Sequence, residues 1–417
     1  MVDERRLTGR LLIVGASLAG LRAAQAARKA GFEGDLVVLG DEAHLPYTRP
    51  PLSKELLAGE HPVERVHFPC DTLEAEWRLE VSASSLDRSR RRVRLSDGEE
   101  VEYDRLILAT GSRPRRWPGP GAELEGVHVL RNLEDSLALR AAFDQRPRVA
   151  IVGAGFIGCE VAQTARKQGL DVTLIDVAPT PMLPLGPELG QWCAELHREH
   201  GVDLRLGIGV IAVLGDGRVE AIELRNGERI EADVVVVGLG AIPNTEWLAG
   251  SGLELNPGIA CDATLTALGS PDILAAGDIV SWPHPLADGD AVRIEHWTVA
   301  AEQGQLVGRN VLEGPGEREP YDAPPYFWSD QYDVKIQSLG FPARGERIEL
   351  VESSPDQRRR VYAADRDGRL VGVIAINAAR RLGHYRLALA DPPALDVLRA
   401  NLADDPAALG PSNAGVR

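Results

Sequence analysis

The segment RVAIVGAGFIG, residues 148–158, gives the clearest indication of the fold. Its first five residues form a β-prone apolar run, and residues 153–158 complete the spacing G-x-G-x-x-G. A helical pattern continues to about Lys167 and ends at Gly169, and a further strand at 172–175 leads to Asp176. A strand, a glycine turn, a helix and a strand with an acid about 20 residues on predict a dinucleotide-binding unit.

Asp176 also predicts which nicotinamide cofactor is preferred. A carboxylate at this position accepts hydrogen bonds from the adenosine ribose hydroxyls and repels a 2′-phosphate. Residues 177–181 contain no arginine that could receive such a phosphate. The sequence therefore predicts NADH over NADPH.

The stretch LLIVGASLAG, residues 11–20, is a second fingerprint, with Ser17 in place of the middle glycine. We expect a strand at 11–14, a helix at about 21–30 ended by Gly31, and a strand at 35–39. Three arginines before residue 11 give this region a superficial likeness to a signal peptide. Gly15, Gly20 and Arg22 interrupt the apolar run, so the strand–turn–helix reading is favoured. Two fingerprints imply two adenine dinucleotides, typically a resident flavin and an exchangeable nicotinamide.

Composition excludes several classes of protein. The 417 residues suggest about three domains, and 44% apolar with 26% charged residues is typical of a globular protein. The formal net charge of −16 disfavours a nucleic-acid partner. The four cysteines lack metal-knuckle spacing, so we expect no metal site, and they fit a reducing cytoplasm. No apolar run approaches the ~20 residues that span a bilayer, so we expect no membrane partner.

Five further stretches carry a resemblance to a known family. They are HLPYTRPPLSK (44–54), LATG (108–111), AAGD (275–278), EHW with EQG (295–297 and 302–304) and PYFWSDQY (325–332). With these, the chain resembles the two-dinucleotide flavoprotein reductases. Within them it is most similar to the ferredoxin reductases of bacterial P450 and ring-hydroxylating dioxygenase systems, of the putidaredoxin reductase type.

The resemblance implies an α/β fold with two Rossmann-like domains, one for FAD and one for NAD, and a carboxy-terminal α+β domain. The motif at 275–278 belongs to the FAD domain but follows the NAD fingerprint, so the NAD domain is expected to be inserted in the FAD domain. The expected limits are 1–113 and 244–320 for the FAD domain, 114–243 for the NAD domain and 321–417 for the last domain. Residues 404–417 are expected to be mobile.

The resemblance also implies a set of cofactor contacts. Asp278 is expected to accept a hydrogen bond from the FAD ribitol, and either Asp41 or Glu42 one from its adenosine. The implied FAD residues are Gly15, Ser17, Ala19, Gly20, Asp41, Arg49, Lys54, Ala83, Ala109, Thr110, Gly111, Arg131, Asp278, Glu295, His296 and Trp297. The implied NAD residues are Gly153, Gly155, Phe156, Ile157, Gly158, Glu160, Asp176, Gly238 and Gly240.

Four side chains are expected at the reacting centre. The resemblance places Lys54 near the reactive edge of the flavin, where a cation stabilises the reduced ring, and gives it Glu160 as a partner. A surface salt bridge between unrelated elements is the alternative. Trp297 and Trp328 are expected to shield the flavin and to leave an outward route for electrons. Plain core packing is the alternative for both tryptophans.

The missing cysteines select the electron acceptor. Residues 45–56 contain neither the CxxxxC pair of the disulfide reductases nor the single redox cysteine of related oxidases. Cys159 is expected to serve only in packing. We therefore expect an NADH-dependent ferredoxin reductase in which hydride passes from NADH to FAD N5, and single electrons then pass to a [2Fe–2S] ferredoxin feeding a P450 or oxygenase. A rubredoxin reductase, or an NADH-sensing flavoprotein of the apoptosis-inducing type, is the alternative.

Docking of an acidic iron–sulfur ferredoxin requires cations on the reductase. Arg309 is the first candidate, followed by Arg113, Arg115 and Arg116, whereas the arginine run at 88–94 is expected to be the solvated face of a hairpin. The acidic balance is compatible with a monomer or a weak dimer.

Overall fold

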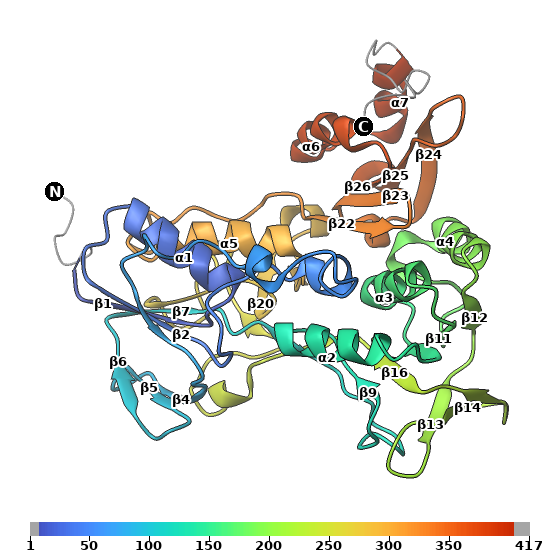
Figure 1. Cartoon of the computed structure of the whole chain (residues 1–417). Coiled ribbons are helices and arrows are strands. Elements are labelled where there is room, and N and C mark those ends of the chain that lie inside the picture. Colours follow the sequence, from blue (N-terminus) through green and yellow to red (C-terminus); the bar gives the residue numbers. More distant parts are fainter. Residues whose placement is uncertain (1–7, 404–417) are drawn as a thin grey trace. The chain divides into compact units, whose positions relative to one another are not determined.

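The structure is a computed structural model of the chain and describes residues 8–403. The described chain divides into two compact units (Figure 1). The first unit contains the chain up to Thr48, His67–Arg113 and Pro243–Phe327. The second contains Arg49–Val66, Pro114–Ile242 and the chain from Trp328 onward. The first unit is therefore interrupted twice, by Arg49–Val66 and by Pro114–Ile242, and the order of the motifs predicts the second of these insertions.

A five-stranded parallel sheet forms the centre of the first unit, in the order β19-β7-β1-β2-β3. Its strands are β1 (Arg10–Val14), β2 (Asp35–Leu39), β3 (Glu76–Arg78), β7 (Arg105–Leu108) and β19 (Ile273–Ala275). The central strands are apolar and buried almost throughout, as is typical of a parallel sheet covered on both faces. The carboxyl ends of β1, β7 and β19 lie at one edge, where the chain continues into the predicted FAD motifs.

Two helices of the first unit, α1 (Leu18–Lys29) and α5 (Trp297–Asn310), lie side by side (Figure 1). Small residues allow their backbones to approach closely. A Cβ atom on Gly304 would lie 2.4 Å from the carbonyl oxygen of Ala19, and one on Gly308 would lie 2.3 Å from that of Ala23. The helix that begins in the EHW motif, α5, thus packs directly on α1, the helix that follows Gly15.

Two small sheets complete the first unit. One is antiparallel and contains β4 (Ala83–Asp87), β5 (Arg92–Leu95) and β6 (Glu100–Glu102). The other contains β18 (Ile259–Ala260), β20 (Val280–Pro283) and β21 (Ala291–Val292), with β18 parallel to β20 and β21 antiparallel to it. Arg92 and Arg94 of β5 both form ion pairs with Glu100 of the neighbouring strand. The arginine run at 88–94 is confirmed as part of a solvent-facing hairpin.

The second unit begins with another parallel sheet, in the order β12-β11-β10-β16-β9. Its strands are β9 (Val127–His128), β10 (Val149–Val152), β11 (Val172–Asp176), β12 (Asp203–Leu206) and β16 (Val234–Val237). The helices are α2 (Leu133–Phe143), α3 (Phe156–Lys167) and α4 (Pro187–Glu199). A small antiparallel sheet of β13 (Val210–Leu214), β14 (Ala221–Leu224) and β15 (Arg229–Glu231) packs its buried residues against β10 and β16.

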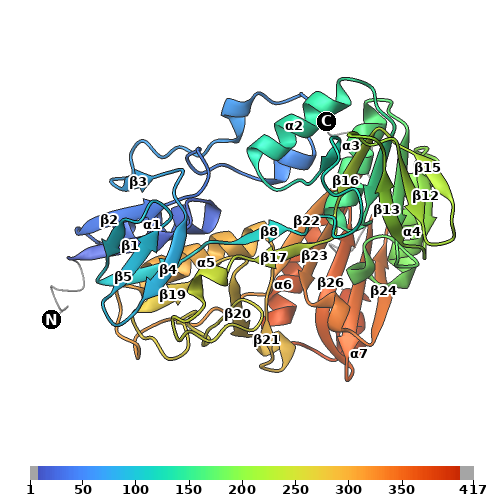
Figure 2. The same ribbon diagram turned by 90° about the horizontal axis from the view of Figure 1, so that it is seen from below.

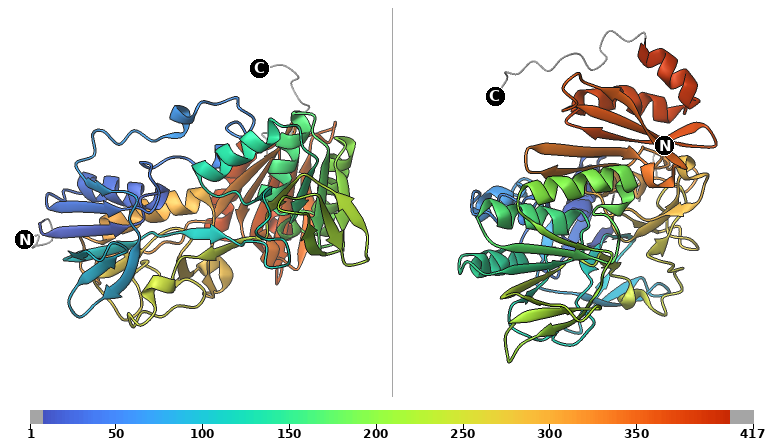
Figure 3. Two further views of the ribbon diagram at one scale, coloured as in Figure 1. Left: turned by 60° about the horizontal axis from the view of Figure 1, so that its bottom comes forward. Right: turned by 90° about the vertical axis from the view of Figure 1, so that its right-hand side faces the viewer.

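The carboxy-terminal part of the second unit is a five-stranded sheet in the order β22-β23-β26-β25-β24, with antiparallel pairing of β23 to β26, β26 to β25 and β25 to β24 (Figure 2). Its strands are β22 (Tyr326–Gln331), β23 (Val334–Gly340), β24 (Arg347–Ser353), β25 (Arg360–Arg366) and β26 (Arg369–Ile376). Helices α6 (Leu382–Ala390) and α7 (Leu395–Ala403) follow the last strand (Figure 3, right panel). Arg381, Glu352 and Tyr385 form a buried polar cluster inside this part.

The predicted fold class is confirmed: two dinucleotide-binding parallel sheets are followed by an α+β part. Where the chain passes between the units lie β8 (Ser112–Pro114) and β17 (Ala241–Pro243). Arg49–Val66 belongs to the second compact unit, although its sequence position is within the first segment of the expected FAD domain. The tail expected to be mobile, 404–417, lies outside the described residues. Across residues 8–403, no helix combines the length and apolar character needed to cross a membrane.

Candidate active site

Glycines close the turn after β1 in the first unit. Gly15 has φ +125°, and a Cβ atom there would lie 2.0 Å from the carbonyl oxygen of Ala109, the residue after β7. A Cβ atom on Gly20 would lie 1.9 Å from the carbonyl oxygen of Gly15. Both positions therefore require glycine, and the turn, the helix and β7 meet at the predicted FAD motifs.

The amino end of α1 suits an anionic group. Its N-cap residue, Ser17, has an extended backbone, and its side chain does not cap the helix. The first turn contains no acidic residue. The first N–H groups of a helix lack intrahelical acceptors, and the helix dipole favours negative charge there. This end therefore fits the pyrophosphate of a dinucleotide, which is the predicted role of Ser17, Ala19 and Gly20.

The third motif of this edge follows β19. Asp278 accepts a hydrogen bond from Ser112 Oγ at 2.8 Å, and its main-chain oxygen accepts one from Arg293 at 3.0 Å. Thr110 and Asn244 exchange two hydrogen bonds of 3.0 and 2.9 Å. The structure thus brings the predicted residues around 109–111 and 278 together within the first unit.

Several buried side-chain nitrogen atoms of the first unit have no hydrogen-bond partner within residues 8–403, and two of them, Gln303 Nε2 and His296 Nδ1, belong to residues in or beside the quoted motifs. Gln303 Oε1 accepts from the N–H of Gly277 at 2.9 Å, which fixes its amide beside the AAGD motif. Burial lowers the pKa of His296 to about 4, so its ring is neutral at pH 7. A buried polar atom without a hydrogen-bond partner is costly, so these two atoms, together with the close glycine turn, fit a bound FAD that would supply the partners.

The surroundings of Asp41 and Glu42, just after β2, favour Asp41 as the acceptor for the FAD adenosine. Glu42 accepts a hydrogen bond from the hydroxyl of Tyr47, whereas Asp41 is exposed directly after the strand. Val81 lies two residues before Ala83, and its N–H donates to the carbonyl of Gly40. Asp41 and Ala83 are therefore brought near the end of β2. Glu295 forms an ion pair with Arg293 at 2.6 Å, and Trp297 begins α5.

The NAD fingerprint of the second unit repeats the same geometry. Gly153 has φ +109°, and a Cβ atom there would lie 2.2 Å from the carbonyl oxygen of Gly238. A Cβ atom on Gly158 would lie 1.9 Å from that of Gly153. A Cβ atom on Gly155, by contrast, would meet nothing within 4 Å. Gly155 is exposed, so the backbone here is open to a ligand phosphate.

The carboxylate of Asp176 hydrogen-bonds the backbone of the NAD fingerprint and of the turn that follows β11. Its carboxylate accepts hydrogen bonds from the N–H of Ala154 at 2.6 Å and from the N–H of Ala178 at 2.7 Å. Ile157 is 47% exposed at the start of α3. Beyond β16, Gly240 adopts φ +82° and its carbonyl accepts from the N–H of Arg115. The predicted NAD residues therefore line the carboxyl edge of β10, β11 and β16.

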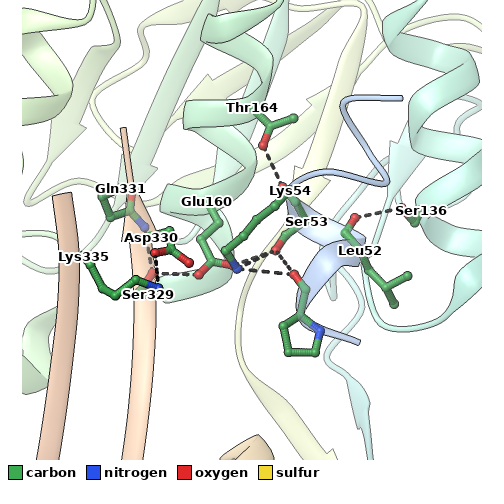
Figure 4. Close-up of polar contacts among 11 residues, drawn as sticks. Leu52, Ser53, Lys54, Ser136, Glu160, Thr164, Ser329, Asp330, Gln331 and Lys335 are labelled. Carbon is green, nitrogen blue, oxygen red and sulfur yellow. Dashed lines mark hydrogen bonds and ion pairs between the residues drawn. The ribbon is translucent and has the colours of Figure 1, made fainter. Parts of the chain in front are cut away.

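Lys54 and Glu160 form a buried ion pair in the second unit (Figure 4). Lys54 Nζ lies 2.6 Å from Glu160 Oε2, with side-chain exposures of 13% and 5%. Ser53 Oγ donates to the same carboxylate oxygen at 2.6 Å, and Ser329 Oγ donates to the other at 2.7 Å. A buried charge of either sign alone is unfavourable, so each group stabilises the other. The pair is not on the surface, which removes the alternative reading of a surface salt bridge.

Arg49 and Arg131, two further predicted FAD residues, also meet in the second unit. Arg49 Nη1 donates to the main-chain oxygen of Arg131 at 2.8 Å. The N–H of Arg131 donates to Asp135, which forms a capping box with Asn132 at the start of α2. The position of Arg131 is thus fixed by the amino end of a helix. Trp328 lies in β22, directly before Ser329.

All four cysteines are buried free thiols. Burial raises the pKa of every one of them, to about 12 for Cys193. A thiol kept protonated is a poor nucleophile and a poor redox partner. The packing role expected for Cys159, which has no exposed surface, agrees with this environment.

The candidate docking arginines differ in their surroundings. Arg309 forms an ion pair with Glu319 at 3.4 Å, and Arg113 forms one with Glu246. Arg115 and Arg116 are exposed. The structure therefore places an acid beside Arg309, the first candidate, and beside Arg113.

Sequence reasoning missed the hydroxyl groups around Lys54. Ser53 precedes Lys54, Ser329 lies inside a quoted motif, and Thr164 follows Glu160 by one helical turn, so spacing could have indicated all three. Nothing in the sequence indicates Ser136, whose hydroxyl donates to the carbonyl of Leu52 at 2.8 Å. Its contact depends on the packing of distant segments.

The fold and its two glycine-rich edges define an oxidoreductase with two dinucleotide-binding sites. The chain belongs to the pyridine nucleotide-disulphide oxidoreductase family, whose model matches residues 9–304. A reductase carboxy-terminal model matches residues 326–411. Members of this family use FAD and NAD(H), and each of the two edges fits one of these cofactors.

Relatives named as ferredoxin reductases match most of the chain. Rhodocoxin reductase of Rhodococcus erythropolis is 37% identical over 378 residues, or 89% of this chain and 87% of the relative. A ferredoxin–NAD(+) reductase component of the anthranilate 1,2-dioxygenase system of Burkholderia cepacia is 37% identical over 388 residues, or 91% and 93%. A solved covalent complex of putidaredoxin reductase with putidaredoxin matches with a TM-score of 0.88 and 31% identity, covering 94% of this chain and 95% of that chain.

Proposed function

We propose that this protein is an NADH-dependent ferredoxin reductase that holds FAD as its resident cofactor. Bound FAD would link NADH, a two-electron donor, to ferredoxin, a one-electron acceptor, since a flavin accepts a hydride equivalent from a nicotinamide and releases electrons singly. The residues at the carboxyl edge of β1, β7 and β19 would hold FAD, with Arg49 and Arg131. The Gly153–Gly158 turn and Asp176 would hold NADH.

The burial and protonation of the cysteines are the observation that supports an external electron acceptor. Four buried, protonated thiols offer no dithiol to receive electrons, so the electrons must leave for an external carrier. The relatives named as ferredoxin reductases support an iron–sulfur ferredoxin as that carrier, which in turn would serve a P450 or a dioxygenase. They favour neither the rubredoxin reductase nor the NADH-sensing flavoprotein.

Lys54 is proposed as the residue that acts on the flavin. Its ammonium would stabilise the negative charge that the ring takes up on reduction, and Glu160 would keep this cation in place. Trp297 and Trp328 are proposed to exclude water from the ring. The whole scheme requires no side chain to act as a nucleophile.

The proposed location is the cytoplasm, and the proposed state is a monomer or weak dimer. A division into an FAD domain (1–113 and 244–320), an NAD domain (114–243) and a carboxy-terminal domain (321–417) remains our working proposal. The four free thiols are compatible with a reducing compartment.

The test is a steady-state assay of the purified protein. The protein should be yellow and contain one FAD per chain. With NADH it should reduce a [2Fe–2S] ferredoxin rapidly, read through cytochrome c, and reduce rubredoxin and oxygen slowly. Equal turnover with rubredoxin would favour the rubredoxin reductase, and a protein that binds no FAD would overturn the proposal.

Lys54→Met tests the mechanism within the same assay. We expect it to retain FAD and to slow reduction of the flavin by NADH by about a hundredfold, since one well-placed electrostatic group contributes about 2.7–4 kcal/mol to catalysis. Lys335→Met is the matched control, because Lys335 is a partly exposed lysine paired with Asp330 in the same unit. A wild-type rate of flavin reduction in Lys54→Met would remove Lys54 from the mechanism.

A further inference from the structure

Two residues of α3 and the residue that caps its carboxyl end bind the segment that carries Lys54. Glu160, Thr164 and Gln168 are four residues apart, which places them above one another along the helix. Glu160 binds Ser53 and Lys54, and Thr164 Oγ1 donates to the carbonyl of Ser53 at 2.7 Å (Figure 4). Gln168 Nε2 donates to the carbonyl of Leu57 at 3.4 Å. These contacts explain why residues 49–66 belong to the same compact unit as α3.

Thr164 hydrogen-bonds the backbone immediately before Lys54. The carbonyl it binds belongs to the peptide group that joins Ser53 to Lys54. Thr164 and Ser53 are 4% and 3% exposed, so water does not readily replace this hydrogen bond. A carbonyl that loses its partner in such a place carries a desolvation cost. The hydroxyl of Thr164 therefore restricts the position of the Lys54 Cα atom, from which the side chain extends.

Ser329 has the corresponding role at the other end of the ion pair. Its hydroxyl donates to Glu160 Oε1, the oxygen that Lys54 and Ser53 do not use. Ser329 accepts in turn from Gln331 Nε2 at 3.0 Å and has no exposed surface. With Ser53 and Lys54 on one oxygen and Ser329 on the other, the carboxylate cannot rotate freely. The direction of the Lys54 ammonium follows from that of the carboxylate.

We propose that Thr164 and Ser329 are positioning residues for the Lys54–Glu160 pair. Thr164 fixes the peptide group before Lys54, and Ser329 fixes the carboxylate that holds its ammonium. The inference rests on the proposed function, in which Lys54 acts on the flavin. Because α3 begins at the NAD fingerprint, one helix both closes the nucleotide-binding turn and sets the position of Lys54.

The variants are chosen so that the fold survives. Thr164→Val removes the hydroxyl without changing the shape of the side chain, and Thr164→Ser keeps the hydroxyl. Leu52, Leu56 and Leu57 are buried and none of them is substituted, so we expect them to keep the segment attached in every variant. Thr173→Val in β11 is the matched control for Thr164→Val. Ser338→Ala, a buried serine in β23, is the matched control for Ser329→Ala.

Hydrogen exchange of the FAD-loaded protein gives the readout that does not depend on activity. The N–H groups of Lys54 and Leu56 are bonded within the segment, to the carbonyl of Pro51. Loss of the Thr164 hydrogen bond should speed exchange of peptides covering 52–58 by about tenfold, which corresponds to the loss of one buried hydrogen bond. Thr164→Ser and Thr173→Val should exchange as the wild type does.

Rapid mixing with NADH gives the second readout. Thr164→Val and Ser329→Ala should each slow flavin reduction at saturating NADH by about tenfold, with an unchanged KM for NADH. In a Lys54→Met background the same changes should slow it no further, because they act through Lys54.

Two failures can be told apart. Wild-type flavin reduction by Lys54→Met would overturn the proposed function of Lys54. Exchange of residues 52–58 that stays at the wild-type rate in Thr164→Val would overturn the inference, whatever Lys54→Met does. An equal slowing of the wild type and of the Lys54→Met background by Ser329→Ala would overturn it for Ser329, because the effect would then not act through Lys54.

Discussion

His197 is a fully buried histidine whose protonation opposes folding. It lies in α4, with Nδ1 3.2 Å from the hydroxyl of Tyr332 and with His200 nearby. Burial, reinforced by the charge of His200, lowers the pKa of His197 from 6.5 to about 4. In the unfolded chain the residue takes up a proton as the pH falls below 6.5, whereas in the folded chain it stays neutral. The free energy of unfolding therefore decreases on this account between about pH 6.5 and pH 4.

His197→Asn should remove this contribution. The loss of unfolding free energy between pH 7 and pH 4 should become smaller than in the wild type by up to about 3 kcal/mol. Urea unfolding at a series of pH values measures the difference. His384→Asn, at an exposed histidine of α6, should keep the wild-type pH dependence. Identical slopes for His197→Asn and the wild type would contradict the buried neutral histidine.

Asp176 should decide the preference for NADH. Asp176→Asn removes the negative charge while leaving an oxygen that can accept from Ala154 or Ala178. Catalytic efficiency with NADH should fall about tenfold, since a hydrogen bond to a charged group contributes about 1.5–3 kcal/mol. Efficiency with NADPH should fall less, because the repulsion of its 2′-phosphate is removed. Asp216→Asn, in an exposed turn of the same unit, is the control. A wild-type ratio of the two efficiencies in Asp176→Asn would contradict this role.

At the scale of elements, the α1–α5 contact should tolerate no added methyl group. Gly304→Ala would place a Cβ atom 2.4 Å from the carbonyl oxygen of Ala19, so the two helices must separate. We expect a loss of about 1–3 kcal/mol of unfolding free energy.

Gly383→Ala provides the matched control for that change. A Cβ atom on Gly383, in α6, would meet nothing within 4 Å. This variant should be neutral or more stable by up to about 1 kcal/mol, because alanine favours the helix. Thermal or urea unfolding of both FAD-loaded variants makes the comparison. Equal stability of the two variants would mean that the close helix contact does not matter.

At the scale of the whole molecule, long-range electrostatics should govern docking. The chain carries a formal net charge of −16, and ferredoxins are generally acidic, so local cations must offset a general repulsion. Glu319 lies 3.4 Å from Arg309 and weakens the field of that candidate. Glu319→Gln should therefore speed ferredoxin reduction at limiting ferredoxin, and Arg309→Gln should slow it.

Both effects should fade with salt. The Debye length falls from about 30 Å at 0.01 M to about 3 Å at 1 M ionic strength. Rates of ferredoxin reduction measured across this range should converge for the two variants and the wild type, while the rate of flavin reduction by NADH changes less. Rates that do not depend on salt would rule out Arg309 as a docking cation.

Local sequence pattern is enough to predict the two nucleotide-binding units. The strands at β2 and β10 and the close glycine pairs Gly15–Gly20 and Gly153–Gly158 all follow from short-range pattern, because a tight turn and a helix packed on it involve residues within one βαβ unit. The start of α1 was the least precise prediction: it begins at Leu18 rather than Leu21. Ser17 gives the helix no side-chain cap that would mark its first residue.

The surroundings of Lys54, by contrast, depend on contacts between segments that are far apart in the sequence. Glu160 is separated from Ser53 by 107 residues and from Ser329 by 169, and Thr164 from Ser53 by 111. The resemblance indicated the partner of Lys54, but not the hydroxyl groups that fix the pair or the membership of residues 49–66 in the second unit. A hydrogen bond depends on where two segments meet in space. No local pattern encodes that meeting, because it results from the packing of all the elements between them.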